Sequence, residues 1–302
     1  MTDTADPSPG RSWRPPALAA GAVVLILVVA GAVVGPRLIG GDDPRPDQAA
    51  APAGQATTNP SPDPAGSGPV ECMDGLADAV AARSPDPVQA GRYTYVHSRW
   101  WGEDMSYSEK EGSTQTRVMY ESKLWRAADG SGRQDVISIP GERSRPDDSA
   151  IYTAGGLAGV LPEPIATSPD VLVTQLQVHS PREMGPQWVL RAVADVYQSH
   201  TVPQPVRVAL LRVLAGQTSG LECENGAVDR EGRTGIAVAV NSNSDKTRDK
   251  LIFDPADGRL LAAEQIILRN PPALTGQTPR TVSYWLFLET SQVADLPPAS
   301  PA

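Results

Sequence analysis

The sequence feature that most constrains this chain is an apolar stretch close to its N-terminus. No charged residue occurs between Pro15 and Pro36, and the residues from 17 to 35 read ALAAGAVVLILVVAGAVVG. About 20 apolar residues, each adding roughly 1.5 Å of helix, match the ~30 Å hydrocarbon core of a bilayer. A buried helix of a soluble domain rarely lacks a polar stripe. We therefore predict a transmembrane helix over residues 17–39.

A cleaved signal peptide is the alternative for this stretch. Ala30-Gly31-Ala32 forms the small-residue pattern at which such peptides are cut. Arg11 and Arg14 lie before the stretch and Arg37 lies after it, so the positive-inside rule favours a cytoplasmic N-terminus. Residues 1–16 are too few to fold. We therefore expect a short cytoplasmic tail, a single span in the cell membrane and an extracytoplasmic C-terminal domain.

Residues 40–70 have the composition of a linker. Residues 41–70 hold seven prolines and no aromatic residue. A segment of this kind cannot bury enough apolar surface to offset the entropy lost on ordering. Proline favours an extended backbone, and the segment can reach ~90 Å at ~3.1 Å per residue. We expect a disordered spacer.

The remaining residues read as one α+β domain over 71–297 with a short tail over 298–302. Apolar residues at helical spacing predict helices, and alternating or β-branched runs predict strands. The expected helices are residues 71–83 and three stretches that begin at Ser168 to Asp170, at Pro186 and at Pro205, the last ending at Gly216. The expected strands are residues 92–101, 115–126, 134–139, 221–229, 234–240, 250–253, 260–268 and 280–289.

The turns between these strands indicate the fold. Asp129–Gly132 and similar glycine-containing turns suit hairpins, which join antiparallel strands. The fold class is therefore α+β, with a curved, half-barrel-like antiparallel sheet of about eight strands packed on a block of helices. The final strand is apolar on both of its faces, which predicts that both faces are covered.

Composition and motifs argue against several functions. The net charge of -9 disfavours nucleic-acid binding, which needs a basic face. Two Cys and three His are too few for a zinc module, and no catalytic or phosphate-binding motif occurs, so we expect no metal, no cofactor and no enzyme activity. A hydrolase with an unfamiliar site is the remaining enzymatic alternative, and it would place His97 near Glu103 or Asp104.

The segment from Tyr93 to Tyr107 is rich in aromatic residues, although the chain has only six Trp, seven Tyr and two Phe. In a strand, side chains two residues apart share a face. The residues that alternation places on one face are Tyr93, Tyr95, His97, Arg99 and Trp101. Core packing is one interpretation of this face. The other is a binding surface for an apolar ligand or for a protein partner.

Cys72 and Cys223 are the only cysteines of the chain. Both belong to the predicted extracytoplasmic part, where thiols oxidise. We predict a disulfide between them, and two free thiols or an intermolecular bond are the alternatives.

Four patterns in fixed order carry a resemblance to a known family. They are Tyr93-Thr94-Tyr95, Trp125-x3-Asp129-Gly130, Val228-Asp229-x2-Gly232-Arg233-x-Gly235 and Phe253-Asp254-Pro255-x2-Gly258. The set resembles an actinobacterial family of uncharacterised single-pass membrane proteins, often encoded beside extracytoplasmic-function sigma factors. The strands around Phe253-Asp254-Pro255 are also distantly similar to the curved sheets of LolA, LppX and RseB-like lipoprotein-binding domains.

Together these observations favour a membrane-anchored, extracytoplasmic, non-catalytic module. It would bind a ligand, lipid or envelope protein partner, and the resemblance implies a role in envelope signalling. A lipid or lipoprotein carrier is the alternative, and it requires a continuous apolar cavity between the sheet and the helices.

Overall fold

The computed structural model describes residues 69–87, 90–108, 112–141, 147–217, 220–242, 244–270 and 276–298. The predicted transmembrane helix over 17–39 and nearly all of the predicted linker lie outside these residues. Within the described ranges, no helix combines the length and the apolar character that crossing a membrane requires. The first helix begins at Pro69, two residues inside the predicted linker, and proline is favourable in a first helical turn.

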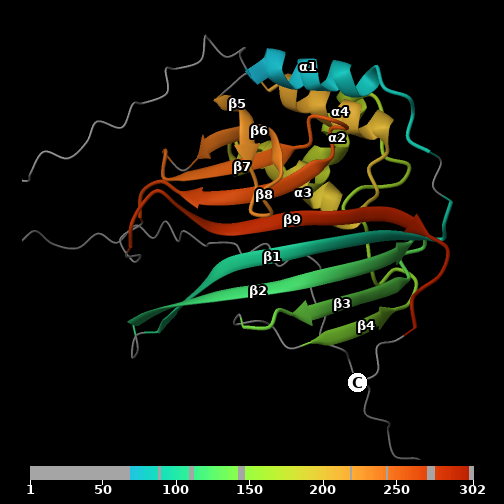
Figure 1. Ribbon diagram of the computed structural model, residues 1–302, viewed down its shortest axis with the longest axis horizontal. Coiled ribbons are helices and arrows are strands. Elements are labelled where there is room, and N and C mark those ends of the chain that lie inside the picture. The colour runs from blue at the N-terminus through green and yellow to red at the C-terminus, as the bar shows by residue number, and fades with distance from the viewer. Residues whose placement is uncertain are drawn as a thin grey trace, which may run out of the picture. The chain divides into compact units, whose positions relative to one another are not determined.

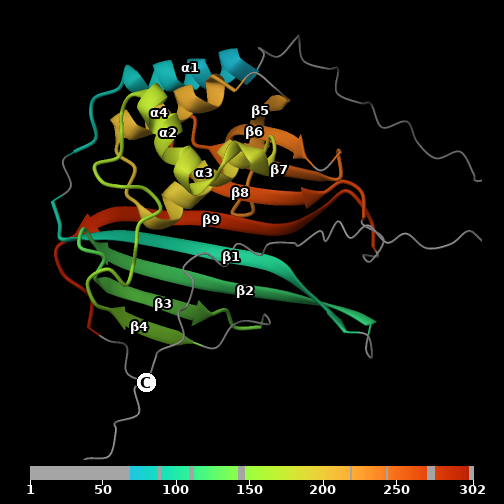
Figure 2. The same cartoon turned by 180° about the vertical axis from the view of Figure 1, so that it is seen from behind.

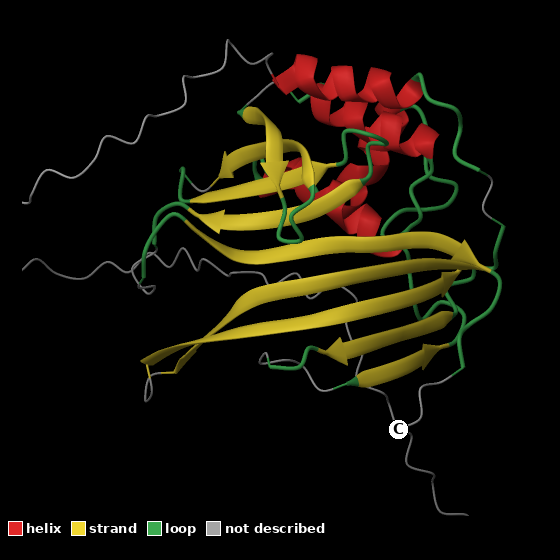
Figure 3. Cartoon of the chain, viewed as in Figure 1, coloured by secondary structure: helices red, strands yellow, loops and turns green. Residues whose placement is uncertain are grey.

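The described ranges contain four α-helices, one short 3-10 helix and nine strands (Figures 1 and 3). The helices are α1 (Pro69–Ala81), α2 (Pro169–His179), η1 (Arg182–Met184), α3 (Trp188–Ser199) and α4 (Gln204–Ala215). The strands are β1 (Tyr93–Ser108), β2 (Gly112–Ala127), β3 (Gly132–Ser138), β4 (Asp148–Tyr152), β5 (Leu221–Val228), β6 (Thr234–Ser242), β7 (Thr247–Phe253), β8 (Leu260–Ile267) and β9 (Arg280–Val293).

All nine strands belong to one antiparallel sheet in the order β4-β3-β2-β1-β9-β8-β7-β6-β5. The last strand of the chain therefore lies at the centre, between β1 and β8. The predicted α+β class with an antiparallel sheet and a block of helices is confirmed. The sequence patterns predict eight strands, and β4 is the one they miss, because five residues are too few to show a period of two.

The helices pack on one face of the sheet, which we name the helix face. Figure 2 shows them in front of the half of the sheet that contains β7 and β8. In neither view does a helix of the described chain lie over β3 or β4. The space between these helices and strands is filled by buried apolar side chains, including Leu172, Val193, Leu211, Val238 and Phe253.

Helix α1 is held to the domain by ion pairs and by a disulfide. Arg212 of α4 bonds Asp74 at 2.7 Å and also pairs with Asp78. Cys72 of α1 and Cys223 of β5 form a disulfide with their Cα atoms 6.5 Å apart, as predicted. The bond links the helix that opens the domain to the edge strand of the sheet.

The opposite face of the sheet, which we name the far face, carries a smaller core. Ala237, Ile252 and Leu286 are almost completely buried there. The turn between β5 and β6 reaches across this face, where Arg230 bonds Glu264 at 3.3 Å. Leu286 of β9 is buried on the far face, and its neighbour Phe287 is buried on the helix face. The predicted coverage of the final strand on both faces is therefore confirmed at its centre.

Two helix ends differ from the sequence prediction. Ser168 precedes α2, but its side chain makes no capping hydrogen bond, so the helix start relies on Pro169, whose fixed φ suits a first turn. The predicted end of α4 at Gly216 is confirmed, although its φ of -68° is a right-handed conformation that any residue adopts. The third helix begins at Trp188, two residues later than predicted.

Candidate functional site

Strand β1 presents two aromatic surfaces, one on each face of the sheet. The five residues that alternation places together, Tyr93, Tyr95, His97, Arg99 and Trp101, all lie on the far face, in register with far-face residues of β2 and β9. We name them the far-face row. Trp100 lies between two of them in the chain and points to the helix face.

The aromatic members of the far-face row pack against neighbouring strands. The ring of Tyr95 stacks on that of Trp125 with centroids 5.1 Å apart. The ring of Trp101 stacks on that of Tyr284 with centroids 5.4 Å apart. Tyr93 is buried with Trp125 in a small separate core. Tyr93 is therefore a core residue. The other two aromatic residues of the row, Tyr95 and Trp101, are only half-buried.

The polar members of the row converge on one carboxylate. His97 Nε2 lies 2.9 Å from Glu121, and Arg99 donates to Glu121 at 2.7 Å and also pairs with Glu231. Burial alone would raise the pKa of Glu121, but the hydrogen bonds from Arg99 and His97 outweigh it and hold the pKa below its ordinary value. The cluster is a hydrogen-bonded network in which Arg99 is shared by two carboxylates, Glu121 and Glu231.

His97 does not meet Glu103, one of the two acids that the hydrolase alternative named, and the side chain of Asp104 lies outside the described residues. His97 is paired with Glu121, whereas Glu103 is paired with Arg280 at 3.2 Å and with Arg117 at 3.7 Å. The reason is the strand register, which sets His97 and Glu103 six residue pairs apart along β1, roughly 20 Å at ~3.3 Å per residue.

The second surface of β1 is a cluster of three half-buried aromatic rings on the helix face. Trp100 lies 5.2 Å from Tyr120 of β2 and 6.3 Å from Trp285 of β9, centroid to centroid. We name these three residues the helix-face aromatic cluster. Trp285 also packs against the main core. The sequence placed Trp100 in an aromatic segment but gave no sign of its partners, which come from strands far away in the chain.

Gly102 is required for the position of the Trp100 ring. A Cβ atom added at Gly102 would lie 2.3 Å from a ring carbon of Trp100, much closer than atoms can approach. The indole therefore lies directly over the glycine, two residues along the same face of the strand.

A pocket opens where β8 and β9 separate. The two strands pair from Ala262 and Leu286 onward, and beyond that point they diverge. Arg233 bridges the gap by donating to the carbonyls of Leu261 and Phe287, both at 2.9 Å. The guanidinium thus supplies the hydrogen bonds that a neighbouring strand would supply in a continuous sheet. Its Nε also donates to Asp229 at 2.7 Å.

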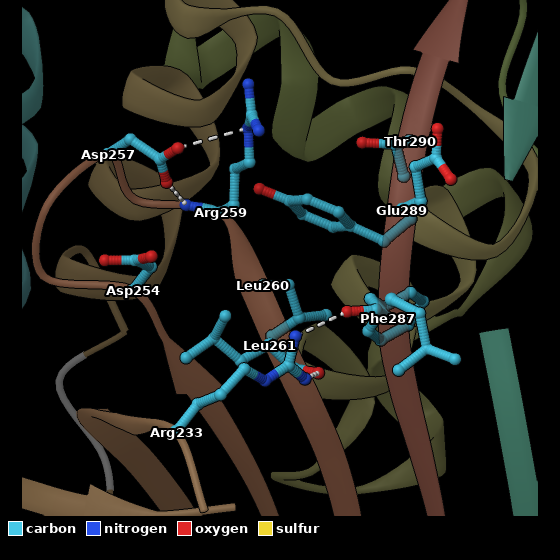
Figure 4. Close-up of a pocket in the computed structure, with 11 residues that line it drawn as sticks. Arg233, Asp254, Asp257, Arg259, Leu260, Leu261, Phe287, Glu289 and Thr290 are labelled. Atoms are coloured by element: carbon cyan, nitrogen blue, oxygen red, sulfur yellow. Dashed lines mark hydrogen bonds and ion pairs between the residues drawn. The ribbon is translucent and has the colours of Figure 1, made fainter. Parts of the chain in front are cut away.

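The pocket has a volume of about 220 Å³ (Figure 4). Its lining is apolar toward the sheet and charged at the edges. The lining residues are Tyr197, Arg233, Asp254, Asp257, Arg259, Leu260, Leu261, Phe287, Leu288, Glu289 and Thr290. Glu289 is the register partner of His97, so the pocket adjoins the far-face row. Burial, together with the charges of Glu289 and Glu121, raises the pKa of Tyr95 in that row to about 12.

A buried polar group lies at the C-terminal end of α3. His200 is 1% exposed, and its Nε2 accepts a hydrogen bond from the backbone N–H of Leu161 at 3.3 Å. Its Nδ1 lies 3.0 Å from Arg126 and 3.2 Å from Glu163, and Arg126 binds Glu163 at 2.5 Å. Burial and the charge of Arg126 lower the pKa of His200 to about 4, so the ring is neutral at physiological pH.

These features define an α+β domain with aromatic surfaces on both faces of one sheet and a small pocket between two central strands. No family model matches the chain, and no curated protein matches it. Among solved structures, a LolA superfamily protein from Nitrosomonas europaea matches at 12% identity, over 76% of this chain and 94% of that chain, with a TM-score of 0.19. A match this distant carries no argument about this chain, and the resemblance to the actinobacterial family stays a prediction.

Proposed function

We propose that this chain is a non-enzymatic, membrane-anchored binding module whose extracytoplasmic domain takes the apolar chain of a lipid. The observation that supports this proposal is the helix-face aromatic cluster. Trp100, Tyr120 and Trp285 are half-buried and lie on β1, β2 and β9. Strand β2 is the neighbour of β3, over which neither view shows a helix of the described chain.

The chemistry of the cluster suits an acyl chain. Aromatic rings present large apolar surfaces, and covering such surface is worth roughly 25 cal/mol per Å². Trp285 packs against the main core, so a chain seated on the three rings would extend that core rather than lie on an isolated patch. Apolar side chains at the edge of a core are a common setting for binding sites of apolar ligands.

The carrier alternative required a continuous apolar cavity between the sheet and the helices. In the structure, buried side chains fill this space, so we place the lipid elsewhere. Beneath the helices, residues such as Leu172, Leu211, Val238 and Phe253 are 0% exposed and already occupy that space. The proposed lipid therefore lies beside the helices, over Trp100 and Tyr120, instead of within the core.

Cross-linking with a lipid analogue tests this proposal. The full-length chain, purified in a nonionic detergent, would be irradiated with a photoactivatable palmitic acid, and the labelled peptides would be identified by mass spectrometry. We expect labelling in the strand segments that carry Trp100, Tyr120 and Trp285. Labelling of residues 17–39 serves as an internal standard for the detergent phase.

Two adjacent tryptophans provide a matched pair of variants. Trp100→Ala should lower labelling of the domain at least fivefold, whereas Trp101→Ala, on the far face, should leave it unchanged. Equal loss in both variants, or labelling confined to the far-face row, would refute a lipid site on the helix face.

A protein partner on the far face is the second candidate function. It is favoured by the half-buried Tyr95 and Trp101, because aromatic side chains that are partly exposed beside charged ones are frequent at protein interfaces. A photo-cross-linking residue at Lys123, on the far face of β2, should then capture a partner in cells. The same residue at Gln134, on the helix face of β3, should not.

A further inference from the structure

The pocket between β8 and β9 adjoins the far-face row through Glu289, but its lining has a different chemistry. Its volume of about 220 Å³ is below the ~300–1,000 Å³ that is usual for drug-sized ligands. A pocket of this size holds one side chain or a similarly small group. Its apolar wall is formed by Leu260, Leu261, Phe287 and Leu288.

The cationic side chains of the pocket are already committed to other groups. Each of the three guanidinium nitrogens of Arg233 donates a hydrogen bond, one to Asp229 and the others to the carbonyls of Leu261 and Phe287. Arg259 pairs with Asp257 at 3.2 Å. All three nitrogens of Arg233 are therefore used within the protein, and the charge of Arg259 is balanced by Asp257.

Two carboxylates of the pocket, Asp254 and Glu289, have no positively charged partner among the described residues. Asp254 accepts a hydrogen bond from the backbone N–H of Ala256 at 2.7 Å, but among the described residues neither Asp254 nor Glu289 forms an ion pair. Figure 4 shows Asp254 on the turn at one side of the pocket and Glu289 on β9 at the other.

We propose that this pocket binds an alkylammonium group, with the apolar stem against the leucines and Phe287 and the cation between Asp254 and Glu289. Long amines behave in this way because their methylene groups gain from apolar contact while the charged end requires a carboxylate partner. The group can come from a lysine side chain of a partner protein or from a free diamine. Both sources present the same chemistry to the pocket.

A titration with small probes tests the proposal on the full-length chain in nonionic detergent. The protein would be labelled with ¹⁵N at leucine, so that Leu260, Leu261 and Leu288 report on the pocket. The probes are Nα-acetyl-lysine N-methylamide, 1,5-diaminopentane and Nα-acetyl-norleucine N-methylamide, which has the lysine stem without its amine.

We expect the lysine probe and the diamine to shift the amide signals of the three pocket leucines in a saturable way. The norleucine probe should bind at least tenfold more weakly. Tighter binding of the capped lysine would assign the site to a protein side chain, and tighter binding of the diamine would assign it to a free amine. Equal binding of norleucine, or no saturable shift with either amine, would overturn the proposal.

A double variant separates the carboxylates from the rest of the pocket. Asp254→Asn combined with Glu289→Gln should weaken the lysine probe at least tenfold and leave the leucine spectrum otherwise native-like. Glu224→Gln, an exposed acid on β5, serves as the matched control and should not change the affinity. If the double variant keeps native affinity while its spectrum is intact, the carboxylates do not bind the cation.

Discussion

Trp100 and Trp101 are adjacent in the chain, yet their rings lie on opposite faces of the sheet and belong to different clusters. Trp100 lies 5.2 Å from Tyr120 on the helix face, and Trp101 lies 5.4 Å from Tyr284 on the far face. One peptide bond thus separates the proposed lipid surface from the candidate protein surface. The variants Trp100→Ala and Trp101→Ala have the same composition as each other, so a difference between them can distinguish the two functions.

The position of Trp100 should depend on Gly102. Gly102→Ala places a Cβ 2.3 Å from the indole, so the ring must leave its site. We expect a loss of about 1–3 kcal/mol in the free energy of unfolding and a changed near-UV circular dichroism spectrum. Gly75→Ala, in α1 with no atom within 4 Å of the added Cβ, should instead stabilise the protein by about 0.5–1 kcal/mol. A Gly102→Ala variant with native spectrum and stability would contradict the tight approach.

Arg233 should contribute strongly to stability because it bridges β8 and β9. Arg233→Met removes hydrogen bonds to two strand carbonyls and leaves Asp229, whose side chain is 0% exposed, without its cation. We expect a loss of roughly 2–4 kcal/mol in chemical denaturation. Arg259→Met, which removes only an exposed pair with Asp257, should cost less than about 1 kcal/mol. Similar losses of stability in both variants would show that the hydrogen bonds from Arg233 to β8 and β9 add no more than an ordinary surface ion pair.

The burial of His200 should make stability depend on pH. Its pKa is about 4 in the folded protein and 6.5 in the unfolded chain, so below pH 6.5 the unfolded state binds the extra proton. The free energy of unfolding should therefore fall by roughly 2 kcal/mol between pH 6.5 and pH 5 through this group. His200→Gln should lack this component, which denaturation of both proteins across that range would show. Parallel curves for the two proteins would exclude the effect.

His179 should act in the opposite direction. The hydrogen bond to Asp195, 2.9 Å away, raises the pKa of His179 despite its partial burial. A raised pKa stabilises the folded state below pH 6.5, and the stabilisation is lost as the pH rises through the folded-state value. His179→Gln should therefore lower stability more at pH 6 than at pH 8. A loss that is independent of pH would argue against the pairing with Asp195.

The disulfide should stabilise the domain through the long loop it closes. Cys72 and Cys223 are 151 residues apart, and closing a loop of this size is worth up to about 4–5 kcal/mol in the chain-entropy model. The Cys72→Ser, Cys223→Ser double variant should unfold at a lower denaturant concentration than the oxidised protein. Treatment of the native protein with a reductant should reproduce that shift, whereas an unchanged midpoint would show that the bond adds nothing.

Local patterns were sufficient to predict much of the fold. Alternation along β1 identified the five residues of the far-face row, and helical spacing located α1 and α4, because these periodicities depend only on backbone geometry. The short strand β4 escaped prediction because its five residues are too few to establish a period. Ser168 precedes α2 without a capping hydrogen bond, and no sequence pattern shows this, since capping depends on where the side chain points.

By itself, the sequence determined the alternation of faces, the antiparallel class of the sheet and the pairing of its only two cysteines, because each follows from local periodicity, turn chemistry or residue count. Only the tertiary structure decided that Trp100 meets Tyr120 and Trp285, and that Arg233 spans the gap beside Glu289. Those contacts join residues up to 185 positions apart, and their geometry depends on strand order and register. No local pattern encodes strand order, because it results from the packing of the whole sheet against its helices.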